Sequence, residues 1–112
     1  ETDMDSTRLP ALVDELIATA RTAHSRRAGH TLHGNSSRHL RQTVIALAAA
    51  TELGEHESPG EATLQVLRGD VTLTAGTDDW HGTAGDLVTI PDARHNLRAN
   101  DDSAVLLTVL AH

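Results

Sequence analysis

The chain has 112 residues, of which 38% are hydrophobic and 22% are charged, and these values are typical of one globular domain rather than of a disordered chain. The net charge is −7 and all nine basic residues are Arg, which argues against a nucleic-acid partner because phosphate binding depends on clustered basic side chains. The chain has no Cys, Lys or Tyr, which excludes thiolate nucleophiles, disulfides, Schiff bases and phenolic acids.

The first five residues, Glu1–Asp5, are acidic and lack the basic-then-apolar order of a signal peptide. No apolar run approaches the roughly 20 residues that a membrane helix needs. We therefore expect a cytoplasmic protein with no membrane partner.

Residues 8–24 carry apolar side chains at helical spacing and polar side chains on the opposite face. The apolar positions are Leu9, Leu12, Val13, Leu16, Ile17 and Ala20. One amphipathic helix cannot bury its apolar stripe alone, so it must pack on the rest of the chain or on a partner subunit. We expect residues 1–28 to form a tail and this helix, and residues 29–112 to form the β-strands on which the helix, or a partner subunit, packs.

The rest of the chain alternates short apolar stretches with turn signals about every ten residues, the pattern of an all-β sandwich or barrel. Strands are expected at residues 30–33, 40–53, 62–68, 71–75, around Trp80, and at 87–90, 95–99 and 104–110. The Gly69-Asp70 pair is interpreted as a tight two-residue turn. The last strand is almost wholly apolar and should lie in the middle of a sheet.

Two of the eight histidines lie at sharp turns beside strands. His56 follows Gly54, and His95 follows the turn that begins at Pro91. If the two strands are neighbours in a barrel, both imidazoles can point into one cavity. Together with one or two oxygen ligands, they could then hold a divalent transition metal with open positions.

The stretch from Gly54 to Gly69 resembles the first sequence motif of the cupin family. His56 falls on the first histidine of that motif, and Gly69 on its closing glycine. The other positions depart from the motif: Ser58 stands for the second histidine, Ala62 for the glutamate and Ala50 for the leading glycine.

The stretch from Gly85 to His95 resembles the second cupin motif. Gly85, Pro91 and His95 match it, and Ala93 stands for its inner glycine. The resemblance covers about residues 40–110 and implies an antiparallel jelly-roll β-barrel, here preceded by one helix. It also implies a metal site in which His56 and His95 occupy two of the four usual ligand positions.

The direction in which two further candidate residues face depends on the strand register. Glu61 and Gln65 are possible additional metal ligands, but they alternate with Ala62 and Leu64 and should face away if those face inward. A bulge after Pro59-Gly60 would reverse this and turn Gln65 into the barrel.

Two more residues are candidates for a ligand pocket. Gln42 lies on a preceding strand, and Trp80 is either a platform for a ligand or a lid over one barrel end. His33 is a further candidate that the sequence alone does not place.

The resemblance leaves several functions open. A bound Fe, Mn, Ni, Cu or Zn ion would serve small-molecule chemistry of the kind found in related cupin dioxygenases, isomerases and decarboxylases. Without metal, one histidine could act as a general base, or the barrel could bind or sense a small molecule with Arg41, Arg94 or Arg98 as anion partners. A degenerate barrel without catalysis is the remaining alternative. The substrate and the catalytic residues are not identified, and we expect a homodimer.

Overall fold

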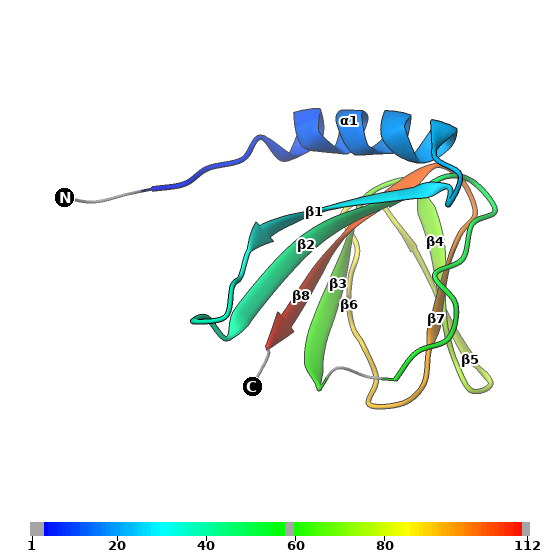
Figure 1. Ribbon diagram of the computed structural model, residues 1–112. Coiled ribbons are helices and arrows are strands. Elements are labelled where there is room, and N and C mark those ends of the chain that lie inside the picture. Colours follow the sequence, from blue (N-terminus) through cyan, green and yellow to red (C-terminus); the bar gives the residue numbers. More distant parts are fainter. Residues whose placement is uncertain (1–3, 58–59, 111–112) are drawn as a thin grey trace.

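The computed structural model describes residues 4–57 and 60–110. One helix precedes eight antiparallel strands (Figure 1), which confirms the predicted all-β class with an N-terminal helix. The elements are α1 (Leu9–Thr22), β1 (Arg27–His33), β2 (Leu40–Leu47), β3 (Glu61–Arg68), β4 (Asp70–Ala75), β5 (Asp78–Thr83), β6 (Leu87–Thr89), β7 (Asn96–Ala99) and β8 (Ser103–Leu110). Within the described part of the chain, no helix is long and apolar enough to cross a membrane.

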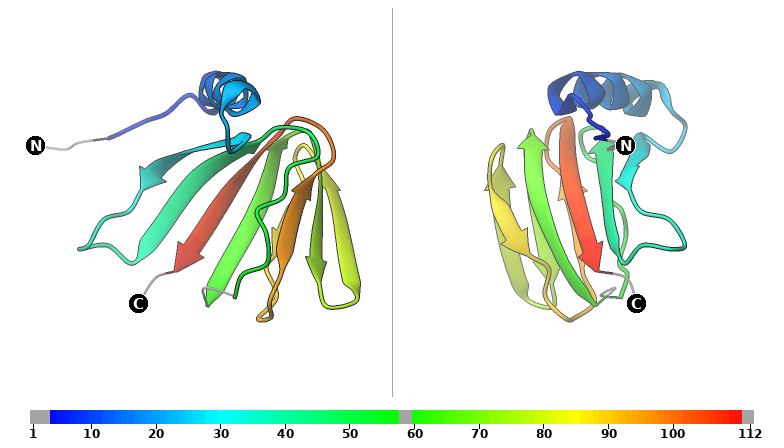
Figure 2. Two further views of the ribbon diagram at one scale, coloured as in Figure 1. Left: turned by 45° about the vertical axis from the view of Figure 1, so that its right-hand side comes forward. Right: turned by 90° about the vertical axis from the view of Figure 1, so that its left-hand side faces the viewer.

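The strands form two sheets that face each other and diverge toward one end (Figure 2). The larger sheet has the order β1-β2-β8-β3-β6, and the smaller has the order β5-β4-β7. Strand β8 lies at the centre of the larger sheet, between β2 and β3, which confirms the position expected from its apolar sequence. Such a strand needs apolar residues on both faces, because both faces are covered.

Alternation along β2 and β8 divides the apolar residues between two cores. Leu47 and Val105 face the smaller sheet and pack in the main core, while Val44 and Ala104 face outward and pack under the helix. Helix α1 lies across the outer face of β1, β2 and β8 (Figure 1), and buries Val13, Leu16 and Ala20 there. The helix therefore covers a sheet of its own chain.

The turn expected at Gly69-Asp70 is a corner between sheets and not a hairpin. Strand β3 pairs with β6 and β8, whereas β4 pairs with β5 and β7. Gly69 has a φ of 92°, and a Cβ at this position would overlap the hydroxyl and Cα of Ser103. Only glycine satisfies both constraints. Gly69 therefore permits the close approach to Ser103 at the point where the chain passes from one sheet to the other.

The strand expected over residues 40–53 ends at Leu47. The chain then turns through Ala50, whose φ is 68°, and continues along the free edge of β7. Backbone hydrogen bonds join Ala50 and Thr51 to Ala99, and Leu53 to Leu97. Residues 50–56 thus extend the smaller sheet irregularly and bring His56 beside His95, which directly precedes β7.

Candidate functional site

The backbones of His56 and His95 form a reciprocal pair. The N–H of each residue donates to the carbonyl oxygen of the other, both at 3.0 Å. Residues paired in this way project their side chains to the same side. The two imidazole rings accordingly meet edge to face, with 4.5 Å between their centroids and 71° between their planes.

Each ring is held by a carbonyl two residues earlier in the chain. His56 Nδ1 lies 2.9 Å from the carbonyl oxygen of Gly54, and His95 Nδ1 lies 2.9 Å from that of Ala93. A carbonyl oxygen only accepts hydrogen bonds, so Nδ1 of each ring carries the proton. In the neutral form, Nε2 of each ring is therefore an unprotonated acceptor.

The two histidines differ in depth. His95 is 3% exposed, whereas His56 is exposed at the rim. Neither Nε2 atom has a hydrogen-bond partner among residues 4–57 and 60–110, and no side-chain nitrogen or oxygen of those residues is both buried and unpaired. Nε2 of His95 therefore borders open space, and both histidines line the same cavity.

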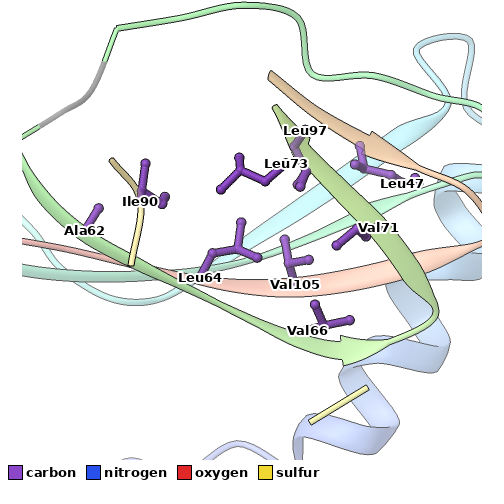
Figure 3. Close-up of a cluster of buried hydrophobic side chains, with 10 residues drawn as sticks. Leu47, Ala62, Leu64, Val66, Val71, Leu73, Ile90, Leu97 and Val105 are labelled. Carbon is purple, nitrogen blue, oxygen red and sulfur yellow. The ribbon is translucent and has the colours of Figure 1, made fainter. Parts of the chain in front are cut away.

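That cavity, here called the cup, lies between the two sheets and has a volume of about 190 Å³. Figure 3 shows part of its wall, where Leu73 and Leu97 of the smaller sheet approach Leu64 and Val105 of the larger one. The cup is lined by Ile45, Leu53, His56, Glu57, Leu64, Leu73, Ile90, His95, Leu97, Val105, Leu107 and Val109. Among the described lining residues, the polar side chains are those of His56, Glu57 and His95.

An ion-pair cluster flanks the histidines at the rim. Arg94 donates from Nη1 to Glu57 Oε1 at 2.9 Å, and its Nε lies 3.7 Å from Glu55 Oε2. The hydrogen bond and charge of Glu57 raise the pKa of Arg94 further above its ordinary value, so this side chain stays cationic. These groups are well exposed, and such pairs contribute little to stability. The two ion pairs connect Glu55 and Glu57, on either side of His56, with Arg94, which precedes His95.

The structure does not bring Glu61 and Gln65 to the histidine pair. Ala62 and Leu64 of β3 face the main core, and the register against β8 is regular from Glu61 to Val66. Gln65 therefore faces the opposite side of the sheet, and Glu61 is exposed beside an outer depression. A bulge does occur in β3, but it lies between Val66 and Arg68. Ser58 and Pro59 lie outside the described residues.

The two pocket candidates are also placed away from the cup lining. Gln42 lies on the outer side of β2, where its Nε2 donates to Thr108 Oγ1 at 3.3 Å. Trp80 packs against the main core from β5, with its ring over Gly82, where an added Cβ would overlap it. Neither side chain lines the cup, so a contact of either with a ligand stays a prediction.

The residues that sequence reasoning missed are mainly Ile45, Leu107 and Val109. They alternate on β2 and β8, and period-two alternation could have placed them on one face. Leu53 and Glu57 could not be found in this way, because they lie on the irregular segment between β2 and β3.

A polar cluster built around His81 and Asp70 lies on the outside of the smaller sheet. His81 Nε2 is 2.7 Å from Asp70 Oδ1, which also accepts a hydrogen bond from Asn100 Nδ2 at 2.8 Å. The hydrogen bonds from Asn100 and His81 hold the pKa of Asp70 below its ordinary value. Val71 and Leu73 face the core, so Asp70 and Thr72 between and beside them face away from the cup.

The donors around the cup fall short of a full set for a metal. Residues 4–57 and 60–110 contain no group of three or more His, Cys, Asp or Glu side chains able to share an ion. His56 and His95 provide two imidazole donors, whereas protein-held transition-metal centres ordinarily use three or four protein ligands. The described donor set is thus incomplete for a metal held by the protein alone.

Neither the models of protein families nor the sequences of curated proteins match this chain. Solved structures do match it. An RmlC-like cupin from Desulfovibrio desulfuricans aligns with a TM-score of 0.74 and 22% identity over 96% of this chain and 97% of its own. The chain has the cupin fold.

Two other solved structures also match the chain, and one of them is described as a cupin superfamily protein. A cupin superfamily protein from Desulfitobacterium hafniense has a TM-score of 0.73 and 14% identity over 87% of this chain and 88% of its own. A conserved protein of unknown function from Streptococcus pyogenes has a TM-score of 0.70 and 26% identity over 80% and 78%. The jelly-roll architecture implied by the two sequence motifs is thereby confirmed.

The hydrogen bonds to Gly54 and Ala93 predict the tautomers of the two site histidines. At about pH 8, where an ordinary imidazole is neutral, we expect the ¹⁵N chemical shifts and couplings of His56 and His95 to report a protonated Nδ1 and a bare Nε2. His24 is exposed and lies outside the cup, so it serves as the reference. A protonated Nε2 on either site histidine would contradict the assignment.

Proposed function

We propose that this cupin binds a small molecule in the cup, with His56 and His95 holding the polar group of the ligand. One observation carries the proposal: an apolar cavity of about 190 Å³ is lined by two imidazoles whose Nε2 acceptors have no hydrogen-bond partner among the described residues. Small-molecule sites commonly combine a largely apolar wall with a few placed polar groups. The proposal needs no third protein ligand and no catalytic group.

Apolar burial and hydrogen bonding both favour the binding of a ligand in the cup. Burying apolar surface contributes about 25 cal/mol per Å², and the wall of the cup is aliphatic. The free energy of binding becomes more favourable when the ligand also forms hydrogen bonds with polar atoms of the pocket that are otherwise poorly hydrated. His95 is such a group, because it is 3% exposed and its Nε2 has no protein partner among the described residues.

A divalent transition metal is the second candidate, favoured by the Nδ1 hydrogen bonds. Histidine ligands of metals characteristically donate the other ring N–H to a carbonyl or carboxylate, and His56 and His95 both do so. A bound Fe, Mn, Ni, Cu or Zn ion would act as a Lewis acid or bind oxygen. Dioxygenase or isomerase chemistry at such a centre stays a prediction, with no catalytic residue assigned.

A homodimer in the cytoplasm stays part of the proposal. The last strand and the N-terminal helix are used within the chain, since β8 lies mid-sheet and α1 covers β1, β2 and β8. Exposed apolar side chains remain elsewhere on the larger sheet, at Leu40 (42% exposed) and Leu87 (64% exposed). These residues support a contact through the part of the outer face that α1 leaves open.

Filling the cup should weaken ligand binding. In Leu107→Phe, the larger side chain enters the cavity, so we expect the affinity for benzene to fall at least about tenfold, as measured by methyl chemical-shift changes. An apolar cavity of about 150 Å³ holds one benzene. Since the ring has space to enter, the loss in free energy of unfolding should stay below the roughly 3 kcal/mol that overpacking can cost.

Leu87→Phe is the matched control for this experiment, because Leu87 is exposed and does not line the cup. It should bind benzene as the wild type does. Wild-type protein that shows no benzene-dependent shifts, or Leu107→Phe protein that binds benzene as tightly as the wild type, would refute the cup as the binding site.

Metal binding is tested by titrating untagged protein with Zn²⁺, Ni²⁺, Cu²⁺, Mn²⁺ and Fe²⁺ in a calorimeter. If the two imidazoles hold an ion, His56→Ala and His95→Ala should each weaken binding about tenfold or more, while His24→Ala should leave it unchanged. Equal affinity in all four proteins, or no binding in the wild type, would reject the metal candidate.

The oligomeric state is tested by light scattering after size exclusion. We expect twice the 11.9 kDa chain mass for the wild type, and a shift toward monomer for Leu87→Glu, which places a charge on the exposed patch. Thr83→Glu, on the smaller sheet, is the control and should stay dimeric. A wild-type monomer would overturn the proposal.

A further inference from the structure

We infer that the cup selects small uncharged molecules that donate a hydrogen bond, such as a phenol or a short alcohol, over molecules that have no donor or carry a negative charge. This inference rests on the proposed binding function and adds the chemical class of the ligand. It follows from three properties of the cup: the protonation of its histidines, the charge at its rim and its size.

The first property is that the polar end of the cup accepts hydrogen bonds. The carbonyls of Gly54 and Ala93 fix the proton of each ring on Nδ1, at 2.9 Å in both cases. With neutral rings, both Nε2 atoms present lone pairs. A ligand hydroxyl can donate a hydrogen bond to one of them. In a ligand that has only acceptors, the acceptor atom would face the lone pair of Nε2 and no hydrogen bond would form.

The second property is the charge around the cup. None of the described lining residues is Lys or Arg, and the ionisable group beside the histidines is the carboxylate of Glu57. At the rim, Arg94 contacts both Glu57 and Glu55, so its one positive charge meets two negative charges. An anion entering the cup would lose hydration and gain no fixed cation in return.

The three arginines considered as anion partners, Arg41, Arg94 and Arg98, lie outside the cup lining. Arg94 already donates to Glu57. Arg41 lines a separate depression with Thr31 and Asn35, and Arg98 is exposed on β7 between inward-facing Leu97 and Ala99. None of the three lines the cup.

The third property is the volume of about 190 Å³. It exceeds by a small margin the roughly 150 Å³ that accommodates one benzene. One six-membered ring with one substituent fits this volume. Phenol and toluene have this size and nearly the same shape, and they differ in whether the substituent donates a hydrogen bond.

The test compares the affinities of phenol, toluene and benzoate for the wild type, His56→Ala, His95→Ala and His24→Ala at about pH 8, where ordinary imidazoles are neutral. Methyl chemical shifts of the leucines and valines that line the cup report binding. The ratio of phenol affinity to toluene affinity removes the contribution of apolar burial, which both ligands share. One neutral hydrogen bond corresponds to about a threefold to tenfold change in that ratio.

We expect the ratio to fall about threefold to tenfold in His95→Ala or His56→Ala and to stay unchanged in His24→Ala. Benzoate should bind at least about tenfold more weakly than phenol. His56 is exposed at the rim, so His56→Ala keeps the test available if His95→Ala does not fold.

Two failures are distinguishable. If toluene binds in the cup but the ratio is the same in all four proteins, or if benzoate binds as well as phenol, the ligand class is wrong, while the cup remains a site at which small molecules bind. If the wild type binds neither phenol nor toluene, the proposed binding function and the ligand class are both wrong.

Discussion

The reciprocal backbone pair between His56 and His95 is the constraint on which the site depends. It joins an irregular segment to the end of β7 with two hydrogen bonds of 3.0 Å and sets both imidazoles on one side. Neighbouring contacts fix its position: Asn96 Oδ1 accepts from the N–H of Gly54, and Arg94 contacts Glu57. The backbone contacts of Gly54 and His56 also position the Gly54 carbonyl, which accepts from Nδ1 of His56. The orientation of this ring therefore follows from the backbone pairing.

The apolar cup depends on how the chain distributes its aliphatic residues. Helix α1 covers the outer face of the larger sheet, which leaves the inner face free to form a concave wall. The chain has no Phe or Tyr, and its single Trp lies over Gly82 and does not line the cup. Leu, Ile and Val side chains from two diverging sheets do not fill the space between them, and a cavity remains.

Local patterns predicted the elements well, because periodicity and turn residues act over a few positions. The helix and the central position of β8 follow from the distribution of apolar residues alone. Pairing between distant segments was harder: the sheet change at Gly69 depends on contact with Ser103, and the course of residues 50–56 depends on the free edge of β7. The cupin resemblance suggested that His56 and His95 meet, but it could not reveal which nitrogen of each ring stays bare.

Ligand binding in the cup, beside the two bare Nε2 atoms, is the central proposal for this chain. A crystal structure of the protein soaked in phenol tests this most directly. We predict one ring in the cup, lying against Ile45 and Leu107 of the larger sheet, with its oxygen about 2.7–2.9 Å from Nε2 of His95 or His56. An empty cup at saturating phenol, or a ring whose hydroxyl points away from both histidines, would contradict the claim.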